Sequence, residues 1–96
     1  MSTRLKAQRG SNNVFRDLGF SEAEAGNLLL RSQLMSEVRE IARGMTQSEA
    51  AKRFGVSQPR INDLLRGKID KFSLDGLVNM LAKAGMRVEL RVKKAA

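Results

Sequence analysis

The sequence predicts a small, mainly α-helical domain of four to five helices, followed by a single C-terminal β-strand. Helix-start signals, in which Ser or Thr precedes Glu by three residues, stand before apolar residues at helical spacing. The last stretch instead alternates apolar and charged residues, which is typical of a half-buried strand. A length of 96 residues suffices for one modest core. We therefore expect a flexible basic tail over residues 1–13, one helical domain over 14–85, and a dimerisation strand with a basic tail over 86–96.

Residues 14–20 are unusually apolar for a segment beside a basic tail. Val14, Phe15, Leu18 and Phe20 lie here, so this short stretch holds two of the chain's four phenylalanines. We expect the segment to pack on the domain's own helices. The alternative is that these four residues bind a partner protein.

A long helix is predicted to follow this segment. Ser21 and Glu24 form a capping-box pattern, and the helix should run to about Arg43, where Gly44 ends it. The inward stripe of this helix is predicted to be Leu30, Leu34, Val38, Ile41 and Ala42.

A second capping box, at residues 46–49, opens a short helix that should end near Phe54, before a tight turn at Gly55. The residues of this helix that are predicted to face the core are Ala50, Ala51 and Phe54.

Two further helices follow the turn. Ser57 is the predicted N-cap of a helix to about Arg66, so that Pro59 falls in the first turn, where a missing amide hydrogen sacrifices no hydrogen bond. Ser73 is predicted to cap the last helix, which Gly85 ends. The apolar residues predicted to face inward from these two helices are Ile61, Leu64, Leu65, Leu74, Leu77, Val78 and Leu81.

The C-terminal segment has a period of two. Its apolar positions are Met86, Val88, Leu90 and Val92, which alternate with charged residues. No other strand is expected in the chain. Because a lone strand leaves its backbone groups unpaired, we expect a homodimer in which two antiparallel copies of this strand pair through those four residues. The alternative is a frayed tail.

The charge pattern favours a polyanionic partner. The net charge is +8, and residues 43–71 alone hold seven basic and three acidic side chains.

The chain has no cysteine and no histidine, which removes thiolate metal sites and the commonest general base. We therefore expect no enzyme activity, no catalytic residue, no metal site and no cofactor. No signal peptide or membrane span is expected, because residues 1–13 are polar and basic and the longest aliphatic run is residues 28–30. We expect the protein to be cytoplasmic and nucleoid-associated.

The outward face of the helix after Ser57 holds side chains that suit base edges. Gln and Asn pair with adenine and Arg with guanine, while Asp can accept from cytosine or orient Arg60 or Arg66. Lys68 and Lys71 follow the helix and suit phosphates, and Gln47 stands at a helix start that can hold one. The predicted DNA-binding residues are Gln47, Ser57, Gln58, Pro59, Arg60, Asn62, Asp63, Arg66 and Lys68. The simpler interpretation is a solvated polar face on a plain helical bundle.

This stretch resembles the helix-turn-helix of bacterial repressors of the Xre/Cro type. The resemblance begins at Gln47 and includes small Ala51 at the helix contact, Gly55 at the turn, and three core residues, Val56, Ile61 and Leu64. Two copies of the helix after Ser57 would then enter successive major grooves, about 34 Å apart, on a near-palindromic site.

Residues 12–92 as a whole resemble the HigA-type antitoxins. The resemblance rests on an opening N-V-F-x-D-L-G-F, the stretches TQSEAAKRFGVSQPRINDLLRGK and DKFSLDGLVNMLAKAG, and the final strand. It implies a dimeric repressor of its own operon that also neutralises a RelE/HigB-type, ribosome-dependent ribonuclease toxin. It further implies that Gln58, Arg60 and their neighbours read the operator.

The alternative function is a protein-binding inhibitor module for which DNA binding is secondary and non-specific. Its support is the Phe15 and Phe20 segment with the basic tail. RNA binding is less favoured, because readers of single strands stack bases on aromatic residues and this chain has no Trp or Tyr.

Overall fold

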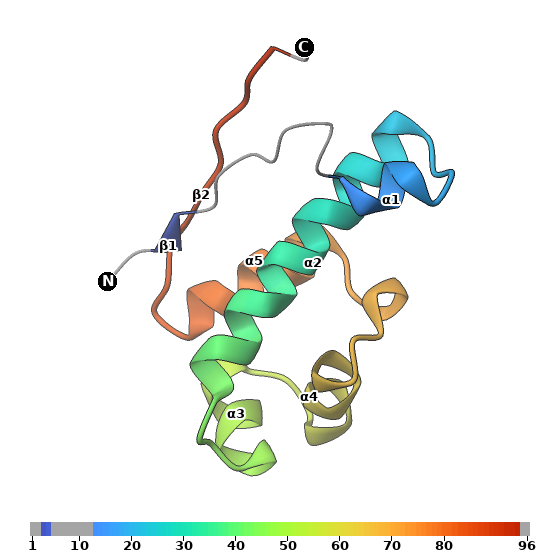
Figure 1. Ribbon diagram of the computed structural model, residues 1–96. Helices are drawn as coiled ribbons and strands as arrows, with labels where there is room; N and C mark the ends of the chain where they lie inside the picture. The colour runs from blue at the N-terminus through green and yellow to red at the C-terminus, as the bar shows by residue number, and fades with distance from the viewer. Residues whose placement is uncertain (1–2, 5–12, 95–96) are drawn as a thin grey trace.

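The computed structural model describes residues 3–4 and 13–94 and is mainly helical, as predicted (Figure 1). Its elements, in chain order, are β1 (Thr3–Arg4), α1 (Val14–Asp17), α2 (Glu22–Ala42), α3 (Gln47–Phe54), α4 (Gln58–Leu65), the 3-10 turn η2 (Ile69–Lys71), α5 (Leu74–Lys83) and β2 (Val88–Glu89). The rest of the predicted basic tail, residues 1–2 and 5–12, lies outside the described residues, as do residues 95–96.

The predicted helix starts are confirmed by their capping hydrogen bonds. Ser21, Thr46, Ser57 and Ser73 each accept a hydrogen bond from the backbone amide three residues later. Such caps satisfy first-turn amides that have no partner within the helix, and each contributes about 1 kcal/mol. The sequence therefore positions four of the helices through local hydrogen bonding.

Helix α2 runs through the middle of the domain, with α5 packed against it and α3 and α4 at its C-terminal end (Figure 1). Phe54 of α3 and Phe72, just before α5, are the largest fully buried side chains. The remaining core residues, all buried and apolar, are Leu34, Met35, Val38, Ala42, Ala50, Ala51, Ile61, Leu64, Leu77, Met80, Leu81 and Ala84. One continuous core thus holds the α3–α4 pair against α2 and α5.

Two residues predicted to face the core do not. Leu65 is 38% exposed and Val78 is 36% exposed. Each lies at the edge of its helix's apolar stripe, where burial depends on whether a neighbouring element covers it, and none does so fully here. Of the others, Leu30, Ile41 and Leu74 are half-buried. The buried Met35 and Met80 complete the stripes and were not predicted.

The expectation that the chain has no second strand is wrong. Val88 and Glu89 of β2 pair in parallel with Thr3 and Arg4 of β1. The strand itself is only two residues long, shorter than the alternating segment 86–92. Part of the hydrogen-bonding capacity of this segment is thus met within one chain, and pairing across a homodimer stays a prediction.

Candidate nucleic-acid interface

Helices α3 and α4 pack against each other and are joined by the three-residue turn Gly55–Val56–Ser57. The capping box at the start of α3 is complete. Glu49 donates its amide to the Thr46 hydroxyl at 3.0 Å, and its carboxylate accepts from the Thr46 amide at 2.8 Å. Gly55 ends α3 with φ +68°, in the left-handed region that favours glycine. These local features build the helix-turn-helix that the sequence pattern predicts.

The first turn of α4 is open to solvent. Ser57 accepts from the Arg60 amide at 3.3 Å, and Pro59 lies in the first turn, as predicted. Gln58 and Pro59 are exposed. The start of this helix is therefore accessible to a ligand that lies across it.

Gln58 and Asn62 stand one helical turn apart on α4, so their side chains share a face. Gln58 is exposed and Asn62 is half-buried, and neither side-chain amide has a hydrogen bond within the described part of the chain. An amide side chain with a free donor and a free acceptor can pair with the edge of adenine. Gln47, the first residue of α3, is exposed as well.

Asp63 does not orient Arg60 or Arg66. Its carboxylate forms ion pairs with Lys68, at 3.4 Å, and with Lys71, at 3.9 Å. The two lysines that were assigned to phosphates therefore stand beside one carboxylate, just after the end of α4.

Arg60 turns back onto the protein. The guanidinium carbon lies 4.5 Å from the centroid of the Phe72 ring, and Nη1 donates to the Lys71 carbonyl oxygen at 3.0 Å. The side chain is half-buried between α4 and the segment that follows it. That Arg60 reads a base stays a prediction.

Much of the positive charge in residues 43–71 is engaged within the protein. Arg43 pairs with Glu40, and Arg53 donates to the Ala84 carbonyl oxygen. Lys52 and Arg66 are exposed and have no hydrogen bond or ion pair among residues 3–4 and 13–94. Lys52 was missed in the sequence analysis, although its place opposite the inward residues of α3 was the available signal.

The capping box lowers the pKa of one of its own side chains. The backbone amide of Thr46 and, to a lesser extent, its side chain hydrogen-bond to Glu49 and lower the pKa of the Glu49 carboxyl below its ordinary value. The carboxylate form thus helps to hold the start of α3.

The predicted partner-binding segment divides into two parts. Phe15 is half-buried and meets Phe20 edge to face, with ring centroids 6.3 Å apart. Val14 is 54% and Leu18 is 70% exposed. The segment packs on α2, as expected, and Asn13 ties it there by donating to the Ala25 carbonyl oxygen at 3.0 Å. It also leaves an apolar surface exposed.

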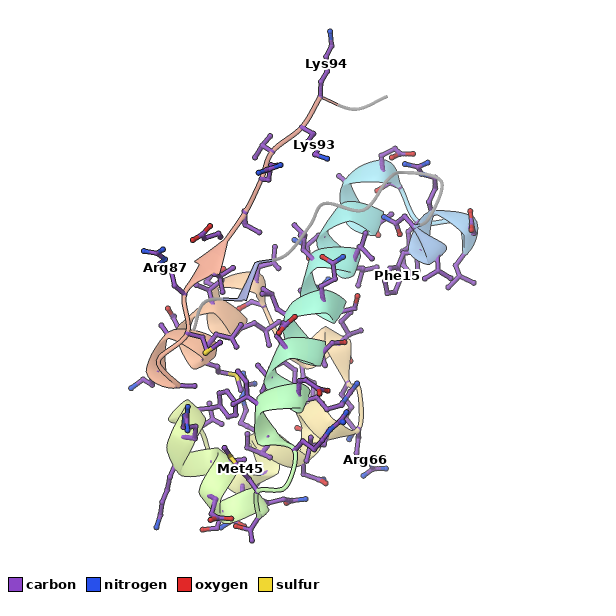
Figure 2. All side chains as sticks on the ribbon, turned by 60° about the vertical axis from the view of Figure 1, so that its left-hand side comes forward. Phe15, Met45, Arg66, Arg87, Lys93 and Lys94 are labelled. Carbon is purple, nitrogen blue, oxygen red and sulfur yellow. The ribbon has the colours of Figure 1, made fainter. Side chains whose placement is uncertain are left out.

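The four predicted dimer residues differ in how far they are buried. Met86 and Val88 are half-buried and pack against the core. Leu90 is 60% and Val92 is 94% exposed. Figure 2 shows Lys93 and Lys94 beyond the helices, where the chain extends away from the domain.

Within residues 3–4 and 13–94, no group of three acidic, histidine or cysteine side chains is placed to hold a metal ion. In the same part of the chain, none of the helices has the length and apolar character needed to span a membrane.

The family of the chain follows from its sequence. A family model described as a helix-turn-helix domain matches residues 14–93. Because the match covers most of the chain, this protein belongs to that helix-turn-helix family, and the match supports an Xre-like DNA-binding regulator. No curated protein matches the chain.

Proposed function

We propose that this protein is a sequence-specific transcriptional repressor that binds a near-palindromic operator as a homodimer. The observation that carries the proposal is the accessible first turn of α4, with the unpaired amides of Gln58 and Asn62 on one face of a helix-turn-helix. Lys52 and Arg66, both exposed and without partners in the described chain, supply charge for phosphates. Such a repressor acts at the nucleoid in the cytoplasm and has no catalytic role.

The test is a fluorescence-anisotropy titration against the DNA upstream of the gene and a shuffled duplex of the same composition, at low and physiological salt. We expect a preference for the upstream duplex that persists at the higher salt, because base-edge contacts are less sensitive to salt than phosphate contacts. Equal, steeply salt-dependent binding to both duplexes would reject sequence-specific repression.

We further propose that the repressor is the antitoxin of a type II toxin–antitoxin pair and neutralises a RelE/HigB-type ribonuclease toxin. The exposed apolar residues Val14 and Leu18, beside the Phe15–Phe20 pair, supply a surface for that partner. The resemblance to the HigA-type antitoxins, which spans the same segment, supports this assignment.

The antitoxin role is tested with a RelE/HigB-type protein encoded beside this gene. Leu18→Lys should abolish binding and restore ribonuclease activity, since it places a charge on the apolar surface without touching the core. Val78→Lys, which changes an exposed apolar residue of α5, is the matched control and should behave as wild type. If Leu18→Lys still inhibits the nuclease fully, the α1 surface is not the toxin site.

The alternative, an inhibitor module with only secondary DNA binding, is favoured by the same exposed surface on α1. It predicts tight binding of the partner together with equal affinities for the upstream and shuffled duplexes. The two titrations together therefore separate the two functions.

A further inference from the structure

The segment of residues 66–72, which follows α4, is fixed by its backbone. Gly67 adopts φ +74° and donates to the Leu64 carbonyl oxygen at 2.9 Å, while the Lys68 amide donates to the Asp63 carbonyl oxygen at 3.1 Å. These two bonds form the Schellman motif that commonly ends helices. The chain therefore leaves α4 in one defined direction.

The Schellman motif also brings the side chains of residues 63 and 68 together. The contact at these two positions is usually apolar. Here it is the ion pair between Asp63 and Lys68, and Lys71 adds its ammonium group to the other carboxylate oxygen. Because partly exposed ion pairs contribute little to stability, the pairing is better explained by where it holds the two lysines.

Arg60 fixes the far end of the same segment. Its guanidinium stacks on the buried Phe72 ring and donates to the Lys71 carbonyl oxygen. Reading guanine requires two guanidinium donors to face the base edge, whereas here the guanidinium lies over Phe72 and its Nη1 is bonded to the protein's own backbone. The side chain is thus arranged to hold the segment.

A second helix contributes to the same anchoring. Arg31 of α2 donates from Nη1 to the carbonyl oxygens of Ile69 and Phe72, at 3.1 and 3.3 Å. The segment is therefore tied to α4 through Arg60 and to α2 through Arg31, although it contains only a single turn of 3-10 helix.

We propose that Arg60 and Asp63 are positioning residues, which hold Lys68 and Lys71 as a preformed phosphate clamp beside the end of the recognition helix. Base reading then falls to Gln58 and Asn62. Each lysine ammonium carries three donors, so one can remain with Asp63 while others bind a phosphate oxygen. This inference rests on the proposed DNA-binding function and reassigns two residues of the predicted reading face.

The test compares Arg60→Lys and Phe72→Leu with the wild-type protein. Arg60→Lys keeps the charge but loses the flat fork, and Phe72→Leu removes the ring under an unchanged Arg60. For each protein the salt dependence of binding is measured on the upstream duplex and on the shuffled duplex. Discrimination is measured against single-base variants of the upstream duplex, and circular dichroism melting reports folding.

We expect both variants to flatten the salt slope by about one to two units, because each lost phosphate contact removes about 0.9. Discrimination between single-base variants should not change. Arg43→Lys is the matched control, since it makes the same substitution at an exposed arginine that pairs with Glu40 and does not contact residues 66–72, and it should keep the wild-type slope.

Loss of discrimination at one base pair in Arg60→Lys, with the slope unchanged, would make Arg60 a base reader and overturn the proposal. Wild-type behaviour of both variants would overturn it as well. Asp63→Asn tests the role of the Asp63 carboxylate. Tighter DNA binding with a steeper salt slope would show that this carboxylate only repels phosphate and does not position the lysines. If the wild-type protein binds both duplexes equally, the repressor function fails, yet the slopes still test the clamp.

Discussion

Arg53 and Ala84 join the first helix of the helix-turn-helix to the end of α5. The Arg53 guanidinium donates from Nε and Nη2 to the Ala84 carbonyl oxygen, at 3.2 and 3.0 Å. Ala84 is the C-cap of α5, where carbonyl groups lack helical partners and a positive charge is favourable. This contact fixes α3 relative to the chain that leads into the C-terminal strand.

Arg53→Ala should lower the free energy of unfolding by about 1 kcal/mol, because it removes a charge-assisted hydrogen bond at a partly exposed helix end. Urea denaturation measures the change. Lys52→Ala, at the neighbouring exposed residue without a partner in the described chain, should stay within about 0.5 kcal/mol of wild type. Equal effects of the two substitutions would show that the contact between Arg53 and Ala84 does not contribute to stability.

Gly55→Ala should destabilise the protein by about 1–2 kcal/mol, since a Cβ is unfavourable at φ +68°. The added methyl group would also meet the Lys83 side chain, which has to move away. Gly67→Ala is the matched control: its φ is +74°, but the nearest atom to the added Cβ is 3.9 Å away. We expect Gly67→Ala to be the milder change in thermal melting, and Lys83→Ala to remove the difference.

Gln58→Ala and Asn62→Ala should each relax discrimination at one base pair, by about 1–3 kcal/mol, because a bidentate amide contact distinguishes adenine from other bases. Anisotropy titrations on single-base operator variants measure this. Arg66→Ala should instead weaken binding to all sequences alike, as expected of a phosphate contact. Unchanged discrimination in both amide variants would place base reading elsewhere.

Leu90→Lys combined with Val92→Lys should convert the proposed homodimer to a monomer, since these two apolar residues extend beyond the domain and are exposed. Light scattering after gel filtration gives the mass. Val88 is a poor choice for this test, because it packs against the core and its replacement would also affect folding. Val78→Lys, the control at an exposed residue of α5, should remain a dimer. If the double variant also remains a dimer, the interface lies on the helices.

Stability should decline in acid partly through Glu49. Its pKa is lowered in the folded state, so the stabilisation is fully present above the ordinary glutamate pKa and disappears as pH falls through the folded value. Glu49→Gln does not titrate, so its difference from wild type in urea midpoint should shrink between about pH 5 and pH 3. In a Thr46→Ala background the same decrease should persist in weaker form, because the backbone amide of residue 46 still donates to the Glu49 carboxylate and only the smaller side-chain contribution is lost. A constant difference across this range would rule out the titration.

The sequence predicted the helix boundaries well because capping is local. Ser57 and Pro59 specify the start of α4 within one turn, whatever packs against it. Periodicity was less reliable at the stripe edges, where Leu65 and Val78 remain exposed because burial depends on distant elements.

The prediction of the site was also limited by contacts between distant parts of the chain. Spacing identified the outward face of α4, but it could not show that Arg60 turns onto Phe72 or that Asp63 meets Lys71, because both contacts depend on the path of the chain after Gly67. The pairing of Thr3 with Val88 joins opposite ends of the chain and left no local signal.

Arg31 stands at the boundary between two surfaces. It lines a pocket of about 420 Å³ with Phe20 and Leu28, close to α1, and the same guanidinium holds the Ile69 and Phe72 carbonyl groups. With the phosphate clamp proposed above, a partner that displaced Arg31 from those carbonyl groups would alter the affinity of the protein for DNA. By thermodynamic reciprocity, DNA would then change the affinity for that partner by the same factor. Through this one side chain, binding of a partner at the pocket and binding of DNA would each affect the other.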